Sequence, residues 1–127
     1  MRLTSSFALA VVLGLTTLTG CHSAYIEATV SNLTPEALSL IEVDYPSASF
    51  GTQALAPGED FHYRFKVLGS GPVTVLWTDA SHHDHRDSGP ILHENDEGRL
   101  IIALTNGGPI WREYLSGKSE SRQSGGS

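Results

Sequence analysis

Residues 61–67, with the sequence FHYRFKV, alternate apolar and polar side chains without a break. Successive side chains of a β-strand point to opposite faces, so Phe61, Tyr63 and Phe65 would share one face and the polar residues the other. Four further stretches follow the same two-residue period: residues 24–30, 39–45, 73–78 and 99–104. Because a helix needs an apolar residue every three or four positions, this pattern predicts a chain built mainly from strands.

Short segments rich in glycine, proline and acidic or amide residues separate these stretches. They are residues 56–60, 69–72, 95–98 and 106–109. Such residues favour tight turns. Residues 34–36, Thr-Pro-Glu, would also suit the start of a helix, but the β-branched and aromatic residues that follow favour a strand, so we expect a turn there. The order of strands and turns resembles an immunoglobulin-like or fibronectin-like fold, which implies an all-β antiparallel β-sandwich of about seven strands.

The N-terminal segment has a different composition. No charged side chain occurs from Leu3 to Ile26, and residues 7–15 are strongly apolar. As a helix, these apolar residues would span ~14 Å, about half of a bilayer's hydrocarbon core. With Arg2 in front of it, the segment is typical of a secretory signal peptide. An uncleaved membrane anchor is the alternative, because the uncharged run is long.

Cys21 is the only cysteine in the chain, so neither an internal disulfide nor a zinc site with several thiolates can form. The preceding residues complete a Leu18-Thr19-Gly20-Cys21 motif that resembles the lipobox of bacterial lipoproteins. The resemblance implies a signal peptide over residues 1–20, a diacylglycerol on the Cys21 thiol, and a lipidated tether over residues 21–24. His22 stands where an aspartate would signal retention in the inner membrane, so the resemblance favours the outer membrane.

The remaining residues divide into a β-sandwich domain over 25–115 and a polar, glycine- and serine-rich tail over 116–127 that we expect to be disordered. Residues 42–79 resemble small uncharacterised bacterial lipoproteins, which implies no particular activity. The chain has 8 basic and 14 acidic side chains, and loss of Arg2 with the signal peptide would leave 7 and 14, a net charge of −7. This acidity argues against binding to nucleic acid or anionic headgroups. We therefore expect membrane association through the lipid alone, with an envelope protein as the possible partner.

Residues 79–96 contain four histidines among several carboxylates. These histidines are His82, His83, His85 and His93. Imidazole is a common ligand of divalent transition metals, and zinc needs three or four converging donors. His83 and His85 would share one face of an extended segment, so zinc or another divalent metal is a candidate cofactor. A solvated loop over residues 80–90, with a turn at Gly89-Pro90, is the simpler interpretation, and a pH-sensing role is a third.

Residues 45–51 join two expected strands and carry Tyr45 and Phe50. The two rings could fold back to cap the sandwich, or they could form an exposed patch that docks a partner.

The chain lacks the sequence motifs of nucleophilic and phosphate-binding enzymes. No serine is followed by lysine at the third position, and no nucleophile elbow or phosphate-binding glycine motif occurs. We therefore expect no enzyme activity and no catalytic residues. The sequence predicts a lipid-anchored, non-catalytic binding or accessory module of the cell envelope, with a metal-binding envelope protein as the alternative.

Overall fold

The computed structural model describes residues 23–116, which contain eight β-strands and no helix. The strands are β1 (Ile26–Asn32), β2 (Leu38–Tyr45), β3 (Ala48–Leu55), β4 (Asp60–Phe65), β5 (Gly71–Thr78), β6 (Asp84–Leu92), β7 (Glu97–Thr105) and β8 (Gly108–Ser116). The predicted β-sandwich is confirmed, with eight strands instead of about seven. The predicted signal peptide, Cys21 and the tail after Ser116 lie outside the described residues, and within residues 23–116 no helix could cross a membrane.

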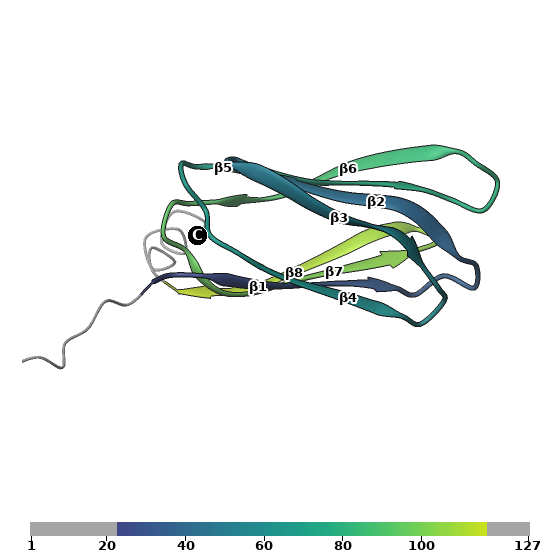
Figure 1. Ribbon diagram of the computed structural model, residues 1–127, viewed down its shortest axis with the longest axis horizontal. Helices are drawn as coiled ribbons and strands as arrows, with labels where there is room; N and C mark the ends of the chain where they lie inside the picture. The colour runs from purple at the N-terminus through teal and green to yellow at the C-terminus, as the bar shows by residue number, and fades with distance from the viewer. Residues whose placement is uncertain (1–22, 117–127) are drawn as a thin grey trace, which may run out of the picture.

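Two four-stranded sheets pack face to face (Figure 1). Sheet A has the order β4-β1-β7-β8, and sheet B has the order β3-β2-β5-β6. Neighbouring strands are antiparallel except for β1 and β7, which run parallel. The expected antiparallel pairing therefore holds for every pair except the central one of sheet A, where β7 runs in the same direction as β1.

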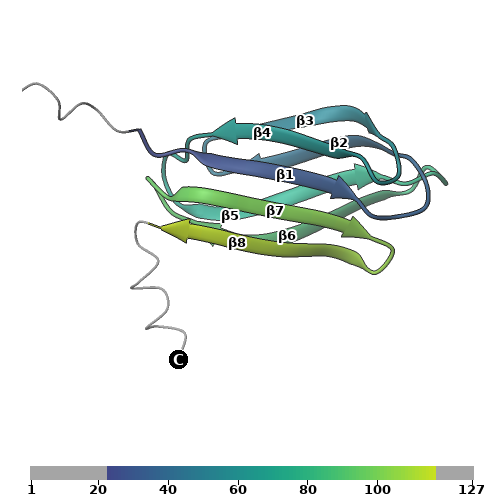
Figure 2. The same cartoon turned by 90° about the horizontal axis from the view of Figure 1, so that it is seen from below.

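The sandwich has two ends, which are useful for locating the loops. At the entry end β1 begins, β8 ends, and the loops over residues 46–47, 66–70 and 93–96 gather (Figures 1 and 2). The far end carries the connections over residues 33–37, 56–59, 79–83 and 106–107. Residues 34–36 form the predicted turn and not a helix.

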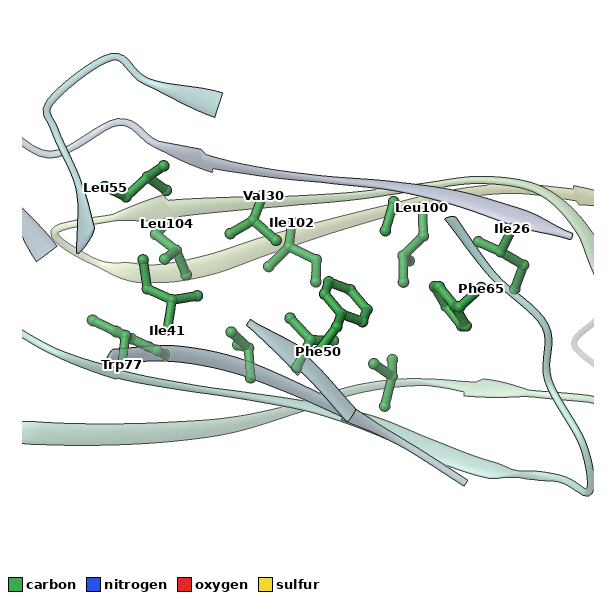
Figure 3. Close-up of a cluster of buried hydrophobic side chains, with 14 of the residues drawn as sticks. Ile26, Val30, Ile41, Phe50, Leu55, Phe65, Trp77, Leu100, Ile102 and Leu104 are labelled. Carbon is green, nitrogen blue, oxygen red and sulfur yellow. The ribbon is translucent and has the colours of Figure 1, made fainter. Parts of the chain in front are cut away.

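The inward faces of the strands form one hydrophobic core (Figure 3). The alternation in the sequence predicted these faces correctly in four strands: Ile26, Ala28 and Val30 in β1, Ile41 and Val43 in β2, Val73, Val75 and Trp77 in β5, and Leu100, Ile102 and Leu104 in β7 are all buried. In β4 only Phe65 is fully buried, and Tyr63 is 43% exposed. The difference arises because β4 is an edge strand.

Two bulges adjust sheet B. In β2 an extra residue relative to β5 leaves Leu40 exposed with a φ of 50°, so that Leu38 and Ile41 both point inward. In β6 the pairing with β5 shifts between Ser88 and Ile91, so Gly89 and Pro90 form a bulge within the strand. The prediction of a turn at these two residues is therefore wrong. A proline is tolerated here because β6 is an edge strand.

The two sheets meet along two sides, and different residues close each side. Where β3 approaches β4, five rings form an aromatic seam consisting of Tyr45, Phe50, Phe61, Tyr63 and Phe65. Where β6 approaches β8, the Trp111 ring packs so closely on Gly89 that a Cβ on this glycine would overlap it. The Trp111 Nε1 also donates a hydrogen bond of 3.4 Å to Asp87 Oδ2. We call Asp87, Gly89 and Trp111 the tryptophan seam.

Candidate functional site

The four histidines considered as metal ligands lie at opposite ends of the sandwich. His82 and His83 belong to the far-end loop, whereas His85 lies in β6, because most of the segment expected as a loop is strand. His93 follows the other end of β6, eight residues from His85, and at ~3.3 Å per residue this separation is about 25 Å. The predicted four-histidine ligand set is therefore not assembled. Among residues 23–116, no three His, Cys, Asp or Glu side chains converge as metal ligands would.

Asp79 organises the far-end loop that carries these histidines. Its Oδ1 accepts hydrogen bonds from the backbone N–H groups of Ser81 at 2.9 Å and His83 at 3.0 Å. Its Oδ2 lies 2.8 Å from His85 Nε2. The hydrogen bond with His85, followed by that from the His83 backbone, lowers the pKa of the Asp79 carboxyl to about 2. The His85 ring in turn stacks on Trp77, with centroids 5.0 Å apart.

A cleft of about 420 Å³ opens beside this loop at the far end. One wall is β6 with the Asp79–His85 pair, another is the turn over residues 34–36, and the third is the β7–β8 hairpin over residues 105–109. Trp77 also lines the cleft, and Asp87 belongs both to this lining and to the tryptophan seam. The cleft is assembled from three segments that are far apart in the sequence.

The charged groups of the cleft are predominantly acidic. Glu36, Asp79 and Asp87 contribute three carboxylates, and Arg86 contributes the one arginine among its lining residues. Thr34, Ser81, Thr105 and Asn106 add neutral polar residues to the lining. Both oxygens of Asp79 already have hydrogen-bond partners, whereas Asp87 accepts the Trp111 hydrogen bond through Oδ2. Glu36 and the Oδ1 of Asp87 are therefore the carboxylate groups best placed to contact a ligand. This chemistry suits a partner that presents amino or hydroxyl groups.

Asn32 is a residue that sequence reasoning missed. Its side chain is fully buried, and its Nδ2 donates to the carbonyls of Glu36 at 2.8 Å and Leu55 at 2.9 Å. Its Oδ1 accepts from the Thr34 N–H at 2.9 Å and the Thr34 hydroxyl at 2.7 Å. Asn32 thereby fixes the turn that forms one cleft wall. The available signal was an asparagine followed two positions later by threonine, which favours a side-chain-stabilised turn.

Tyr45 and Phe50, considered as a partner-binding patch, belong to the aromatic seam. The turn between β2 and β3 contains only Pro46 and Ser47, so Phe50 lies inside β3. Phe50 is 7% exposed, and the half-buried Tyr45 ring lies 4.2 Å from that of Phe65, centroid to centroid. The two rings therefore cap the core, which is the first of the two interpretations of this segment, and Phe50 does not form the exposed patch of the second.

No protein-family model and no curated protein sequence matches this chain. The chain is similar to a solved NMR structure of a protein from Eubacterium rectale, with a TM-score of 0.53. The match covers 76% of this chain and 97% of that one at 13% sequence identity. The structural likeness shows a shared fold, and at an identity this low it carries no functional information.

Proposed function

We propose that this chain is a lipid-anchored, non-catalytic module of a bacterial cell envelope that binds a partner through its far-end cleft. The anchor is the Cys21 thiol, in accordance with the Leu18–Cys21 motif and the short apolar segment before it. His22 after the cysteine favours the outer membrane over the inner membrane. The partner is a protein or other envelope component with exposed amino or hydroxyl groups, which complement Glu36 and Asp87 in the cleft.

The observation that carries this proposal is the position of the cleft relative to the start of β1. Ser23 precedes β1 at the entry end, whereas the cleft lies at the far end. The seven residues of β1 separate the two ends by about 20 Å. A lipid on Cys21 would therefore hold the entry end at the membrane and leave the cleft accessible to a partner.

Fractionation of the native host tests the anchor. We expect the wild-type protein in the membrane fraction and the Cys21→Ser variant in the periplasmic fraction, because two or three acyl chains hold a protein firmly to a bilayer. A Cys21→Ser protein that remains with the membrane would show that another segment anchors it.

Affinity purification after crosslinking in cells tests the cleft. The Glu36→Arg variant reverses a charge in the cleft, and Glu94→Arg makes the same change at the entry end. Both side chains are exposed, so both variants should fold. We expect the partners recovered with wild type to be retained by Glu94→Arg and lost by Glu36→Arg. Equal recovery with all three proteins would contradict the assignment of the cleft.

A further inference from the structure

The charges of the domain are distributed unevenly between its faces. The outer side of sheet A carries Arg64 on β4, Arg99 on β7 and Arg112 on β8, each next in sequence to an inward-pointing or core residue. Glu27, Asp60 and Glu97 are the acidic residues on the same side. This face therefore has three basic and three acidic side chains, whereas the rest of residues 23–116 has two basic and ten acidic ones.

Strand pairing brings the basic residues into adjacent positions. Arg64 pairs with Glu27, Glu27 with Arg99, and Arg99 with Tyr114, which forms one row across all four strands. Arg112 lies in the next row, opposite Ile101. We call the outer positions of sheet A that carry Arg64, Arg99, Arg112 and Tyr114 the basic face.

Tyrosine rings support two of the three guanidinium groups. The Arg64 Cζ lies 4.3 Å from the Tyr25 ring centroid, and the Arg99 Cζ lies 5.0 Å from that of Tyr114. A guanidinium stacked on a ring keeps its N–H edges available to oxyanions such as phosphate. The Arg64–Glu27 ion pair, at 3.6 Å with both side chains about 60% exposed, is a weak competitor for such a ligand.

The basic face is continuous with the predicted anchor. Its arginine–tyrosine row lies at the entry end, and Tyr25 is four residues from Cys21, which at full extension is at most ~14 Å. Arginine is attracted to anionic headgroups, and tyrosine is enriched at the membrane–water interface. The net acidity of the chain argued against such binding, but the fold separates the arginines from most of the carboxylates.

We propose that the basic face docks on anionic phospholipid headgroups, so that the domain lies with sheet A against the bilayer. This inference rests on the proposed anchor at Cys21, which supplies the proximity that a net acidic protein needs. The acidic outer side of sheet B then faces away from the membrane. The cleft opens along the membrane surface.

Lipid photocrosslinking tests this orientation. The chain from Cys21 to Ser127 is coupled through its single thiol to a maleimide-headgroup lipid in phosphatidylcholine vesicles, with or without phosphatidylglycerol. A benzophenone amino acid replaces Ile101 on the basic face or Ser49 on the outer side of sheet B, and mass spectrometry measures lipid adducts. Because the anchor is attached chemically, a lack of natural lipidation would defeat the proposed function without changing this result.

We expect adducts at position 101 to exceed those at position 49 by about fivefold or more in anionic vesicles, and to decrease with added salt. The double variant Arg99→Glu/Arg112→Glu should abolish this difference, whereas Arg86→Glu on sheet B should preserve it. Equal yields at both positions, or yields that the double variant does not change, would overturn the proposal. Yields that the double variant does not change would indicate that the arginines of this face serve another partner, such as an acidic protein.

Discussion

The two sides on which the sheets meet are closed in different ways. In the aromatic seam, Phe50 stacks on Tyr63 with ring centroids 4.5 Å apart and lies 5.5 Å from Phe65, so apolar contact extends from β3 to β4. In the tryptophan seam a single half-buried ring covers Gly89, and its Nε1 reaches Asp87. Asp87 also lines the cleft, so the cleft adjoins this seam.

The difference separates the requirements of stability from those of binding. Buried aromatic rings contribute both hydrophobic burial and ring–ring contact, so the aromatic seam should carry much of the fold's stability. The cleft is bordered by polar side chains on β6 that could not be buried without partners. A fold stabilised on one side can keep an open, polar site on the other.

Truncating each seam gives the largest expected effect. Phe50→Ala should lower the free energy of unfolding by about 3–5 kcal/mol, because it removes a buried ring and leaves a cavity. Trp111→Ala should lower it by about 1–3 kcal/mol, since this ring is only half-buried. Urea titration measures both values. A larger effect for Trp111 would reverse the comparison.

The close packing of Trp111 on Gly89 gives the next prediction. Gly89→Ala should lower the free energy of unfolding by about 1–3 kcal/mol, because the new methyl overlaps the indole. The loss should shrink in the Trp111→Ala background, where the ring is absent. Gly107→Ala is the control, since its Cβ would meet only Thr105 Oγ1 at 3.8 Å. A full loss without Trp111 would place the strain in the β6 backbone.

The loop beside the cleft should respond to acid. The Asp79 pKa is lowered to about 2 in the folded protein, so its stabilisation is present above pH ~4 and is lost as the pH falls towards 2. Asp79→Asn should reduce the melting temperature near pH 7, by less than Gly89→Ala, and the difference from wild type should vanish near pH 2. A difference that is constant with pH would mean that the carboxylate charge is unimportant.

The smallest effect concerns Glu42 on the outer side of sheet B, near the aromatic seam. A hydrogen bond with Asp44 and the repulsion of its charge raise the Glu42 pKa. Protonated Glu42 is thus favoured by folding, and this contribution is lost as the pH rises through the folded pKa. Glu42→Gln, which stays neutral, should slightly raise the melting temperature at pH 7 and leave it unchanged below pH ~4. A lower melting temperature at pH 7 would contradict the raised pKa.

The sequence predicted the core well where alternation is local and regular. The inward residues of β1, β5 and β7 follow from their two-residue period, because burial on one face of a strand imposes it. The same reasoning missed β6. Its inward residues His85 and Asp87 border the cleft, and its Gly89-Pro90 bulge has the composition of a turn. An edge strand beside a polar opening therefore lacks the pattern that identifies a buried one.

The candidate sites could not be predicted because they depend on pairing between distant segments. The cleft joins residues 34–36 to 79–87 and 105–109, and no local pattern specifies which loops share an end of the sandwich. The basic face likewise needs β1 to lie between β4 and β7. Conversely, the four-histidine cluster was close in sequence, but β6 extends and carries His93 away from the other three.

Intact mass analysis of the protein purified from its native host tests the central claim of a lipid anchor most directly. The account predicts a mature chain that begins at Cys21 and carries a diacylglycerol on the thiol, with or without an acyl group on the new amino terminus. An unmodified thiol at Cys21, or a mature protein that begins at another residue, would contradict it.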